Sequence, residues 1–289
     1  MATLADWVEG ARLRTLPAAV APVLVGTGAA YALDSGSVPR ALLAAGVALA
    51  LQVGVNYAND YSDGVRGTDD VRTGPPRLTG SGAARPGQVK AAAFAGFGVA
   101  AVLGLVLCAV AGTWWVIAVG AVAVLAAWRY TGGKNPYGYR GLGEIAVFVF
   151  FGLVAVLGTT YTQALTVSWA ALAGATGIGL LACALLMVNN VRDIPTDTVA
   201  GKRTLAVRLG DARARRTYVA MVVLPLVLAL ALAPQHPWAL LVLVLAPWAW
   251  HLSRTVLGGA TGRGLIVVLR DTGLLELASG LLLGVARVL

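Results

Sequence analysis

The chain has 289 residues, of which 58% are hydrophobic and only 12% are charged, and its mean hydropathy is +0.78. A soluble domain usually carries about 25% charged residues, so this composition excludes an ordinary soluble protein and indicates lipid as the main solvent. The net charge of +9 does not predict nucleic acid as a partner, because the basic residues lie beside apolar runs, where topology and anionic lipid headgroups account for them. The two cysteines lie within apolar runs and form no disulfide framework or metal-ligand spacing.

Charge-free runs long enough to cross a bilayer follow one another along the chain, and each crossing needs about 20 apolar residues. The expected spans are 15–33; 41–59; two within 91–128, with a turn at 112–115; two within 145–191, with a turn at 158–163; two within 217–253, with a turn at 233–238; and a weaker one at 265–289. The sequence therefore predicts an all-α polytopic membrane protein with about nine transmembrane helices. Residues 1–289 are expected to form a single integral-membrane domain.

The basic residues predict the orientation of these spans. If the nine spans are correct, 20 of the 22 lysines and arginines fall on one side of the membrane, and only Arg40 and Arg287 fall on the other. The positive-inside rule then places the N-terminus and the charged loops in the cytoplasm. The expected location is the cytoplasmic membrane of a bacterial cell, as a multi-pass protein.

Four aspartates follow the second expected span within eleven positions, in the stretch NYANDYSDGVRGTDD. Residues four apart share one face of a helix, and Asn56 and Asp60 have this spacing, as do Asn59 and Asp63. Carboxylates at a membrane helix end are costly unless they are paired or bind a cation, which makes a functional site the default interpretation.

A second cluster with the same spacing follows the sixth expected span. Asn189, Asp193 and Asp197 lie four residues apart in the stretch NNVRDIPTD. Pro195 lies between the two aspartates, and a proline inside a helix removes a hydrogen bond and clashes with the preceding turn. The helix is therefore expected to break or restart there.

The two clusters together predict a metal-dependent diphosphate site. Their ligands are oxygen atoms only, which favours a hard cation such as Mg²⁺, and Mg²⁺ is usually held by carboxylates together with substrate phosphates. Guanidinium and ammonium groups that suit phosphate oxygens lie near both clusters. These basic residues are Arg72, Arg77, Lys134, Arg140, Lys202 and Arg203. One such cluster could be a solvated helix end, but two on separate inner loops favour a site.

Four blocks of sequence, in this order, resemble a known family. They are ANDYSDGVRGTD, RTGPPRLTGSG, NPYGYRGLGE and NNVRDIPTDTVAGKRTLAVRLG. With nine expected helices, the whole chain resembles the UbiA superfamily of intramembrane prenyltransferases, and most closely the 1,4-dihydroxy-2-naphthoate polyprenyltransferases of menaquinone synthesis (the MenA type). The general superfamily pattern would place an aspartate at position 67, where this chain has Gly67. Either Asp69 or Asp70 could complete the first metal site.

The resemblance implies transfer of a polyprenyl group from polyprenyl diphosphate to 1,4-dihydroxy-2-naphthoate, giving demethylmenaquinol, CO₂ and diphosphate. The acceptor ring would attack the allylic cation at the carbon that bears its carboxylate, and loss of CO₂ and a proton would restore aromaticity. Two Mg²⁺ ions would assist the departure of the diphosphate. The metal ligands implied are Asp60, Asp63, Asp69, Asp193 and Asp197.

Other residues are assigned from charge, location and the same resemblance. Diphosphate binding is expected of Arg72, Arg77, Lys202, Arg203, Asn59 and Asn189. Lys134 or Arg140 could hold the acceptor carboxylate. The substrate pocket is expected to contain Asn56, Tyr130, Tyr139 and Phe148, whose aromatic faces could stabilise the cation. Tyr130 and Tyr139 could instead belong to the interfacial aromatic belt.

Two alternative functions remain open at this point. Another member of the superfamily would use a different acceptor, such as 4-hydroxybenzoate, homogentisate, a tetrapyrrole or a glycerol phosphate. A cation-coupled transporter would also have many spans and buried acids, but its site would lie near the middle of the bilayer rather than at span ends. The sequence does not specify the length of the prenyl chain, the oligomeric state or a preference for Mg²⁺ over Mn²⁺.

Overall fold

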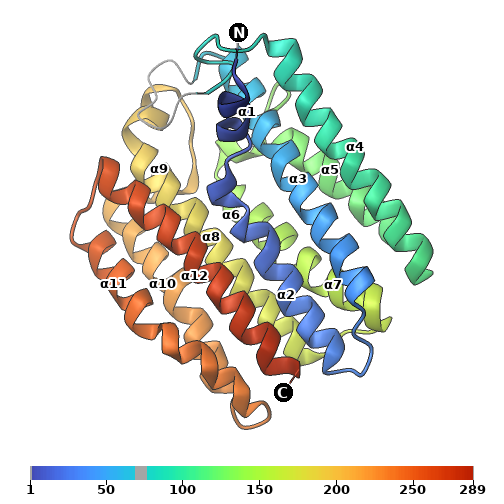
Figure 1. Cartoon of the computed structure of the whole chain (residues 1–289). Coiled ribbons are helices and arrows are strands. Elements are labelled where there is room, and N and C mark those ends of the chain that lie inside the picture. The colour runs from blue at the N-terminus through green and yellow to red at the C-terminus, as the bar shows by residue number, and fades with distance from the viewer. Residues whose placement is uncertain (1, 69–76, 289) are drawn as a thin grey trace.

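The computed structural model describes residues 2–68 and 77–288, and every regular element in these residues is helical. The N-terminal half contains α1 (Leu4–Gly10), η1 (Leu13–Thr15), α2 (Pro17–Tyr31), α3 (Val38–Val65), α4 (Pro86–Ala111), α5 (Val116–Thr131), η2 (Tyr137–Arg140), α6 (Gly143–Val147), η3 (Phe148–Val154) and α7 (Ala155–Ala164). The C-terminal half contains α8 (Trp169–Val199), α9 (Leu205–Leu209), α10 (Asp211–Leu232), η4 (Pro237–Leu245), α11 (Ala246–Leu257) and α12 (Gly262–Val288). The long helices form one bundle (Figure 1).

The bundle confirms a polytopic membrane fold. Among the described residues, six helical segments are long and apolar enough to cross a membrane, and a seventh is formed if Leu4–Thr15 and Pro17–Tyr31, which meet at 46°, count as one span. Two further long helices agree with expected spans but fall short of this standard. Helix α5 has only 16 residues, and α12 carries Arg270, Asp271 and Glu276 within its length.

Two expectations about helix breaks were wrong. The turn expected at 158–163 lies inside α7, and the chain turns at 165–168 instead. The helix accommodates this polar segment, because the hydroxyls of Thr159 and Thr162 are satisfied within it: they donate to the carbonyl oxygens of Ala155 and Gly158, four residues earlier.

The break expected at Pro195 is also absent. Helix α8 runs without interruption from Trp169 to Val199, with Pro195 inside it. The proline lies near the end of the helix, where the missing N–H leaves a single carbonyl without its helical donor. Asp193 and Asp197 therefore stay on one continuous helical face.

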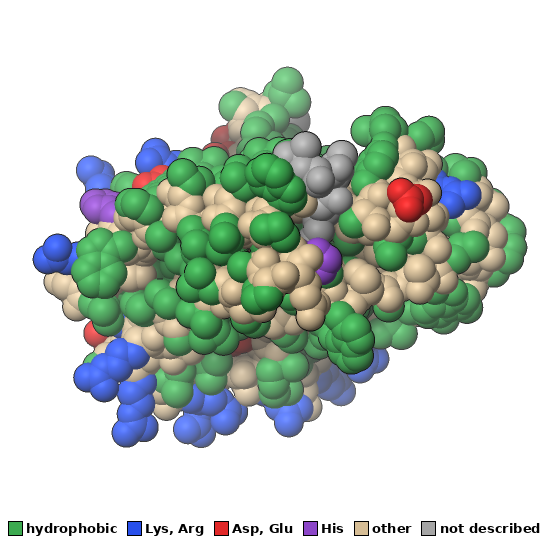
Figure 2. All heavy atoms as spheres, turned by 90° about the horizontal axis from the view of Figure 1, so that it is seen from below, with side chains coloured by type: hydrophobic (Ala, Val, Ile, Leu, Met, Phe, Trp, Pro, Cys, Tyr) green, Lys and Arg blue, Asp and Glu red, His purple; other side chains and the backbone are tan. Residues whose placement is uncertain are grey.

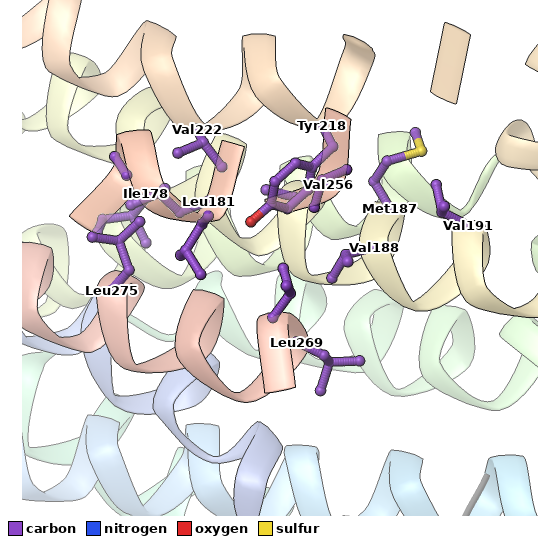
Figure 3. Packing of buried hydrophobic residues seen from close by; sticks show 14 of the residues in the cluster. Ile178, Leu181, Met187, Val188, Val191, Tyr218, Val222, Val256, Leu269 and Leu275 are labelled. Atoms are coloured by element: carbon purple, nitrogen blue, oxygen red, sulfur yellow. The ribbon is translucent and has the colours of Figure 1, made fainter. Parts of the chain in front are cut away.

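Helix α8 is the centre of the main hydrophobic core. Figure 3 shows Ile178, Leu181 and Met187 from α8 packed between Tyr218 and Val222 of α10 and residues of α12. The Tyr218 and Thr272 hydroxyls share a hydrogen bond of 2.8 Å inside this core, so the buried phenol is satisfied. Helix α8 is thereby held on both sides, which gives its polar end a rigid support.

Small residues let α2 and α12 approach closely. A Cβ atom on Gly280 would lie 2.8 Å from the Cα atom of Ala21, a separation that real side chains do not adopt. Close approach through glycine is typical of helix pairs in lipid. In Figure 2, seen from below Figure 1, hydrophobic side chains are spread among other residues over the middle of the surface, and most of the Lys and Arg side chains in view lie toward its margins.

Candidate active site

A cavity of about 990 Å³ runs through the bundle. Helices α2, α3, α4, α5 and α8 and the η3–α7 segment contribute to its wall. The wall is polar near the end of α8 and near the loop at 132–136, which joins α5 to η2. The remainder is mainly aliphatic and aromatic. A cavity with a charged head and a long apolar body suits a ligand of the same construction.

The end of α3 supplies Asn56, Asn59 and Asp63 to the polar wall. Successive residues of a helix are rotated by about 100°, so these three side chains fall within an arc of about 60° on one face. Asp60 lies about 40° beyond the Asn56 edge of this arc and does not line the cavity. Its spacing from Asn56 does not bring it into the cavity wall.

Asp60 instead binds backbone. It is only 1% exposed, and its two carboxylate oxygens accept hydrogen bonds from the backbone N–H groups of Leu78 and Thr79, both at 2.9 Å. The carboxylate therefore fixes the chain directly after Arg77, which lines the cavity. Asp60 thus supports Arg77 in this structure, and its predicted role as a metal ligand stays a prediction.

Asp63 is the centre of a charged group that joins the end of α3 to η2 and to the α8–α9 loop. The Tyr139 hydroxyl donates to its Oδ1 at 2.6 Å, and the Nζ of Lys202 lies 3.6 Å from its Oδ2. The same Nζ lies 4.7 Å from the centroid of the Tyr139 ring, in a cation–π contact. Three sequence-predicted residues from segments that are distant in sequence thus meet at one point.

The Tyr139 phenol stays protonated in this environment. Burial raises its pKa well above the usual value, and the neighbouring charge of Asp63 adds to the effect. Thr68 Oγ1 lies 3.3 Å from the same hydroxyl. Arg66 anchors the adjacent loop through the carbonyl oxygens of Thr131 and Gly133. Tyr139 is therefore a fixed hydrogen-bond donor rather than a member of an aromatic belt.

The end of α8 supplies a second charged group. Arg192 donates to both carboxylate oxygens of Asp193, at 2.7 and 2.6 Å, and to the Oδ1 of Asn189 at 2.8 Å. The Arg192 side chain is only 5% exposed. Asp197 lines the same wall, one turn further along the helix. Sequence reasoning missed Arg192, although its position directly before Asp193 was available as a signal.

The donor set fits Mg²⁺ that arrives with a phosphate ligand. The cavity offers carboxylate and amide oxygens, which are hard ligands. Among the described residues, no group of three or more Asp, Glu, His or Cys side chains is arranged to hold a metal ion by itself. The carboxylates of Asp63 and Asp193 are instead balanced by Lys202 and Arg192. Such a site suits a metal whose remaining ligands come from the substrate.

Sequence reasoning also missed the contribution of the N-terminal segment. Arg12, Arg14 and Thr15 line the cavity, although the two arginines entered the sequence argument only as topological signals. Gln52 and Asn56 of α3 each donate to the Thr15 hydroxyl, at 2.9 and 3.0 Å. The backbone of Arg12 is left-handed, with φ of 54°. This conformation is strained for residues other than glycine, and it persists mainly where the surrounding structure enforces it.

Several predicted residues lie outside the cavity wall. Lys134 and Arg140 are exposed, and so is Arg203, whose backbone N–H donates to the carbonyl oxygen of Tyr139 at 2.9 Å. Phe148 packs against Gly179 instead: a Cβ atom built on Gly179 would lie 3.0 Å from the Phe148 ring.

Other predicted residues do line the wall, and some cannot be placed. The residues in the wall are Asn56, Asn59, Asp63, Arg77, Tyr130, Tyr139, Asn189, Asp193, Asp197 and Lys202. Phe150 and Phe151 take the place expected for Phe148. Asp69, Asp70 and Arg72 lie outside the described residues.

Comparison with known proteins identifies the family. The model of the UbiA prenyltransferase family matches residues 19–262, which is most of the chain. The chain belongs to the UbiA prenyltransferase family. The sequence-based expectation of this family is thereby confirmed.

Relatives in the family are similar over nearly their whole length. The chain is 56% identical over 274 residues to the 1,4-dihydroxy-2-naphthoate octaprenyltransferase of Mycobacterium tuberculosis (strain ATCC 25618 / H37Rv), covering 95% of this chain and 94% of that protein. It is 40% identical over 261 residues to the enzyme of the same name from Escherichia coli (strain K12), covering 87% of this chain and 84% of that protein.

Solved structures confirm the UbiA fold. A UbiA homolog from Archaeoglobus fulgidus bound to DMAPP and Mg²⁺ matches with a TM-score of 0.69 and 14% identity, covering 98% of this chain and 99% of that chain. The apo structure of a homolog from Aeropyrum pernix K1 matches with a TM-score of 0.70 and 16% identity, covering 93% of this chain and 96% of that chain.

Proposed function

We propose that this protein transfers a polyprenyl group from polyprenyl diphosphate to 1,4-dihydroxy-2-naphthoate, with loss of CO₂ and diphosphate, giving demethylmenaquinol. The observation that carries the proposal is the full-length identity of 56% with an octaprenyltransferase that uses this acceptor. The cavity supports it, because its charged head and apolar body match a diphosphate joined to a long hydrocarbon chain.

The diphosphate would bind between the ends of α3 and α8. Asp63, Asp193 and Asp197 line this region, and they are the residues that would hold Mg²⁺, with two ions expected. Mg²⁺ bound there would act as a Lewis acid that neutralises the departing diphosphate. The neighbouring cations of Arg77, Lys202 and Arg192 would contact the phosphate oxygens directly and stabilise the charge on the leaving group.

The apolar body of the cavity would hold the prenyl tail and exclude water. Leu51 of α3, Val119 of α5 and Phe150 of η3 are among its lining residues. Exclusion of water protects an allylic cation from hydrolysis. At the far end, the indole N–H of Trp115 donates to the Tyr161 hydroxyl at 3.3 Å.

The acceptor carboxylate would bind at the N-terminal segment. Arg12 and Arg14 line the cavity, whereas Lys134 and Arg140 are exposed. Both arginines are therefore candidates for this contact, and the Arg12 side chain is the one tested here. The Arg12→Ala variant is expected to raise the KM for the naphthoate while leaving the KM for the prenyl donor unchanged, as measured from initial rates. An unchanged acceptor KM would remove Arg12 from this role.

The location follows from topology and the chemistry of the donor. The multi-pass fold places the apolar cavity among membrane-spanning helices. The distribution of basic residues supports an N-terminus and active site facing the cytoplasm of a bacterial cell membrane. Chemical labelling of single cysteines introduced at exposed loop positions, in intact cells and in open vesicles, tests this orientation.

An acceptor assay tests the function itself. Membranes containing the protein are incubated with octaprenyl diphosphate, Mg²⁺ and one acceptor at a time, and the products are identified by mass spectrometry. We expect product only with 1,4-dihydroxy-2-naphthoate, with the mass of one CO₂ missing from the simple adduct. Prenylation of 4-hydroxybenzoate or homogentisate in its place would assign a different acceptor, and absence of any diphosphate release would contradict prenyl transfer.

A further inference from the structure

A buried carboxylate lies behind the cavity wall and has no role in the chemistry described so far. Glu144 is in the first turn of α6 and is 4% exposed. Its Oε1 accepts a hydrogen bond from the Nδ2 of Asn190 at 3.1 Å, while its Oε2 is buried and has no hydrogen-bond partner among the described residues. Ionisable side chains at membrane depth are costly and usually serve a function.

Asn190 connects this carboxylate to the cavity. It lies on α8, three residues before Asp193, and its side chain is part of the cavity wall. A carboxylate oxygen accepts hydrogen bonds, so the amide nitrogen of Asn190, and not its oxygen, must face Glu144. The amide is planar, and its Oδ1 is therefore turned away from Glu144; none of the described residues donates a hydrogen bond to it.

The surroundings of this pair favour an aromatic ligand. Tyr130 lines the cavity, and its hydroxyl oxygen would lie 3.3 Å from a Cβ atom built on Gly143. Tyr130 also lies within electrostatic range of Glu144 and of Asp63 and Asp197. Asn190, Tyr130 and the proposed Mg²⁺-binding carboxylates thus all line the same cavity.

The backbone of Glu144 is also bonded to α8. The thiol of Cys183, two turns before Asn190 on α8, donates to the Glu144 backbone carbonyl at 3.1 Å. Backbone and side chain of Glu144 are thus both bonded to α8, the most firmly packed helix of the bundle. This arrangement fixes the orientation of the Asn190 amide before any substrate arrives.

We propose that Glu144 is a positioning residue that directs the amide oxygen of Asn190 into the cavity, where it accepts a hydrogen bond from a ring hydroxyl of the acceptor. This inference rests on the proposed function, because it requires a hydroxylated aromatic acceptor. When Asn190 accepts a hydrogen bond from this hydroxyl, electron density in the acceptor ring increases. The same bond holds the ring against the prenyl diphosphate. Glu144 itself touches no substrate in this role.

Kinetics of Glu144 variants test the proposal. In the purified full-length protein in lipid nanodiscs, Glu144→Ala is expected to raise the KM for 1,4-dihydroxy-2-naphthoate about tenfold, the effect of losing about 1.4 kcal/mol of binding. The KM for octaprenyl diphosphate should change by less than about twofold, because the prenyl diphosphate site is not expected to be coupled to the substitution at Glu144. Glu144→Gln should restore most of the acceptor affinity, because its amide oxygen can accept the same bond from Asn190.

Three further measurements separate positioning from a general structural effect. Asn190→Leu should produce the same change in acceptor KM, and the double variant Glu144→Ala/Asn190→Leu should add little to either single variant. The preference for 1,4-dihydroxy-2-naphthoate over 2-naphthoate as competing ligands should fall in both single variants. Glu276→Gln is the matched control, because Glu276 is 0% exposed, also has unpartnered carboxylate oxygens and does not line the cavity.

The outcomes distinguish the inference from the proposed function. Absence of turnover of the naphthoate by the wild-type protein would contradict the function. Wild-type turnover with an unchanged acceptor KM in Glu144→Ala would overturn only the positioning role. Equal damage by Glu144→Gln and Glu144→Ala, or an effect on the donor KM alone, would also overturn it. Thermal unfolding of each variant in detergent verifies that comparisons are made between folded proteins.

Discussion

The two helix ends that form the charged site are built differently. On α8, Asp193 and Asp197 both line the cavity, and the counter-charge for Asp193 comes from Arg192 of the same helix. On α3, Asp63 lines the cavity while Asp60 binds the backbone at 78–79. On α8 the counter-charge of Asp193 therefore comes from the same helix, whereas Asp63 of α3 depends on residues outside its helix.

The difference shows that a spacing of four residues does not by itself determine which aspartates line the cavity. An aspartate lines the cavity only if it falls within the arc of its helix that faces the cavity, and Asp60, about 40° outside that arc, does not. Asp63 in turn depends on Tyr139 and Lys202, which come from segments far away in sequence. Variants at these positions can test whether the two halves carry unequal tasks.

The largest effect is expected from Asp63→Ala and Asp193→Ala. Each removes a carboxylate from the polar wall, and we expect prenyl transfer to fall by about a thousandfold or more, the upper range for losing an electrostatic stabiliser of the reacting charges. Folding and membrane insertion should be retained. Product formation from octaprenyl diphosphate measures the loss, and Asp271→Ala, outside the cavity wall, is the control. Wild-type turnover in either cavity variant would contradict the metal-site assignment.

A smaller and different effect is expected from Asp60→Ala. It leaves the buried backbone N–H of Leu78 and the partly buried N–H of Thr79 without their acceptors, which should lower the free energy of unfolding by about 1–3 kcal/mol. Activity should fall by about tenfold through displacement of Arg77. The Mg²⁺ concentration that gives half-maximal activity should not change, in contrast to Asp63→Asn. A rise in that concentration for Asp60→Ala would show that Asp60 is a metal ligand after all.

A loss of about tenfold or less is expected from Tyr139→Phe, since it removes one hydrogen bond to Asp63 while keeping the ring that contacts Lys202. The raised pKa of Tyr139 carries a pH prediction. A phenol with a raised pKa remains a donor beyond its usual titration range, which is centred near about pH 10. The ratio of wild-type to Tyr139→Phe activity should therefore stay constant from neutral pH to about pH 10. A ratio that falls toward one in this range would contradict the assignment.

The smallest effect is expected from Lys134→Ala and Arg140→Ala. Both side chains are exposed and lie outside the cavity wall. Removal of an exposed charge near a site changes binding by at most about 1 kcal/mol. Acceptor and donor KM values should stay within about fivefold of wild type, as 1 kcal/mol corresponds to about that factor. A large increase in the acceptor KM would restore one of them as a carboxylate ligand.

Much of the site could be predicted from the sequence because its residues occur in short, compositionally unusual segments. A carboxylate is rare beside an apolar helix, so Asp63, Asp193 and Asp197 stand out without any structure. Arg12 and Arg192 do not stand out in this way, because arginines beside membrane spans are common as topological signals. Glu144 follows a glycine-rich loop, and nothing local to it indicates that it bonds to Asn190, 46 residues later.

The sequence by itself determined that the chain spans the membrane with an oxygen-rich site at the helix ends. Hydrophobic runs and the placement of charges indicate whether a segment lies in lipid or in water, and both can be read directly from the sequence. Only the tertiary structure decided which carboxylate of the α3 end faces the cavity, and which cation balances each acid. Rotation of a helix about its axis and contacts between distant loops depend on how all the helices pack together, and no local pattern specifies them.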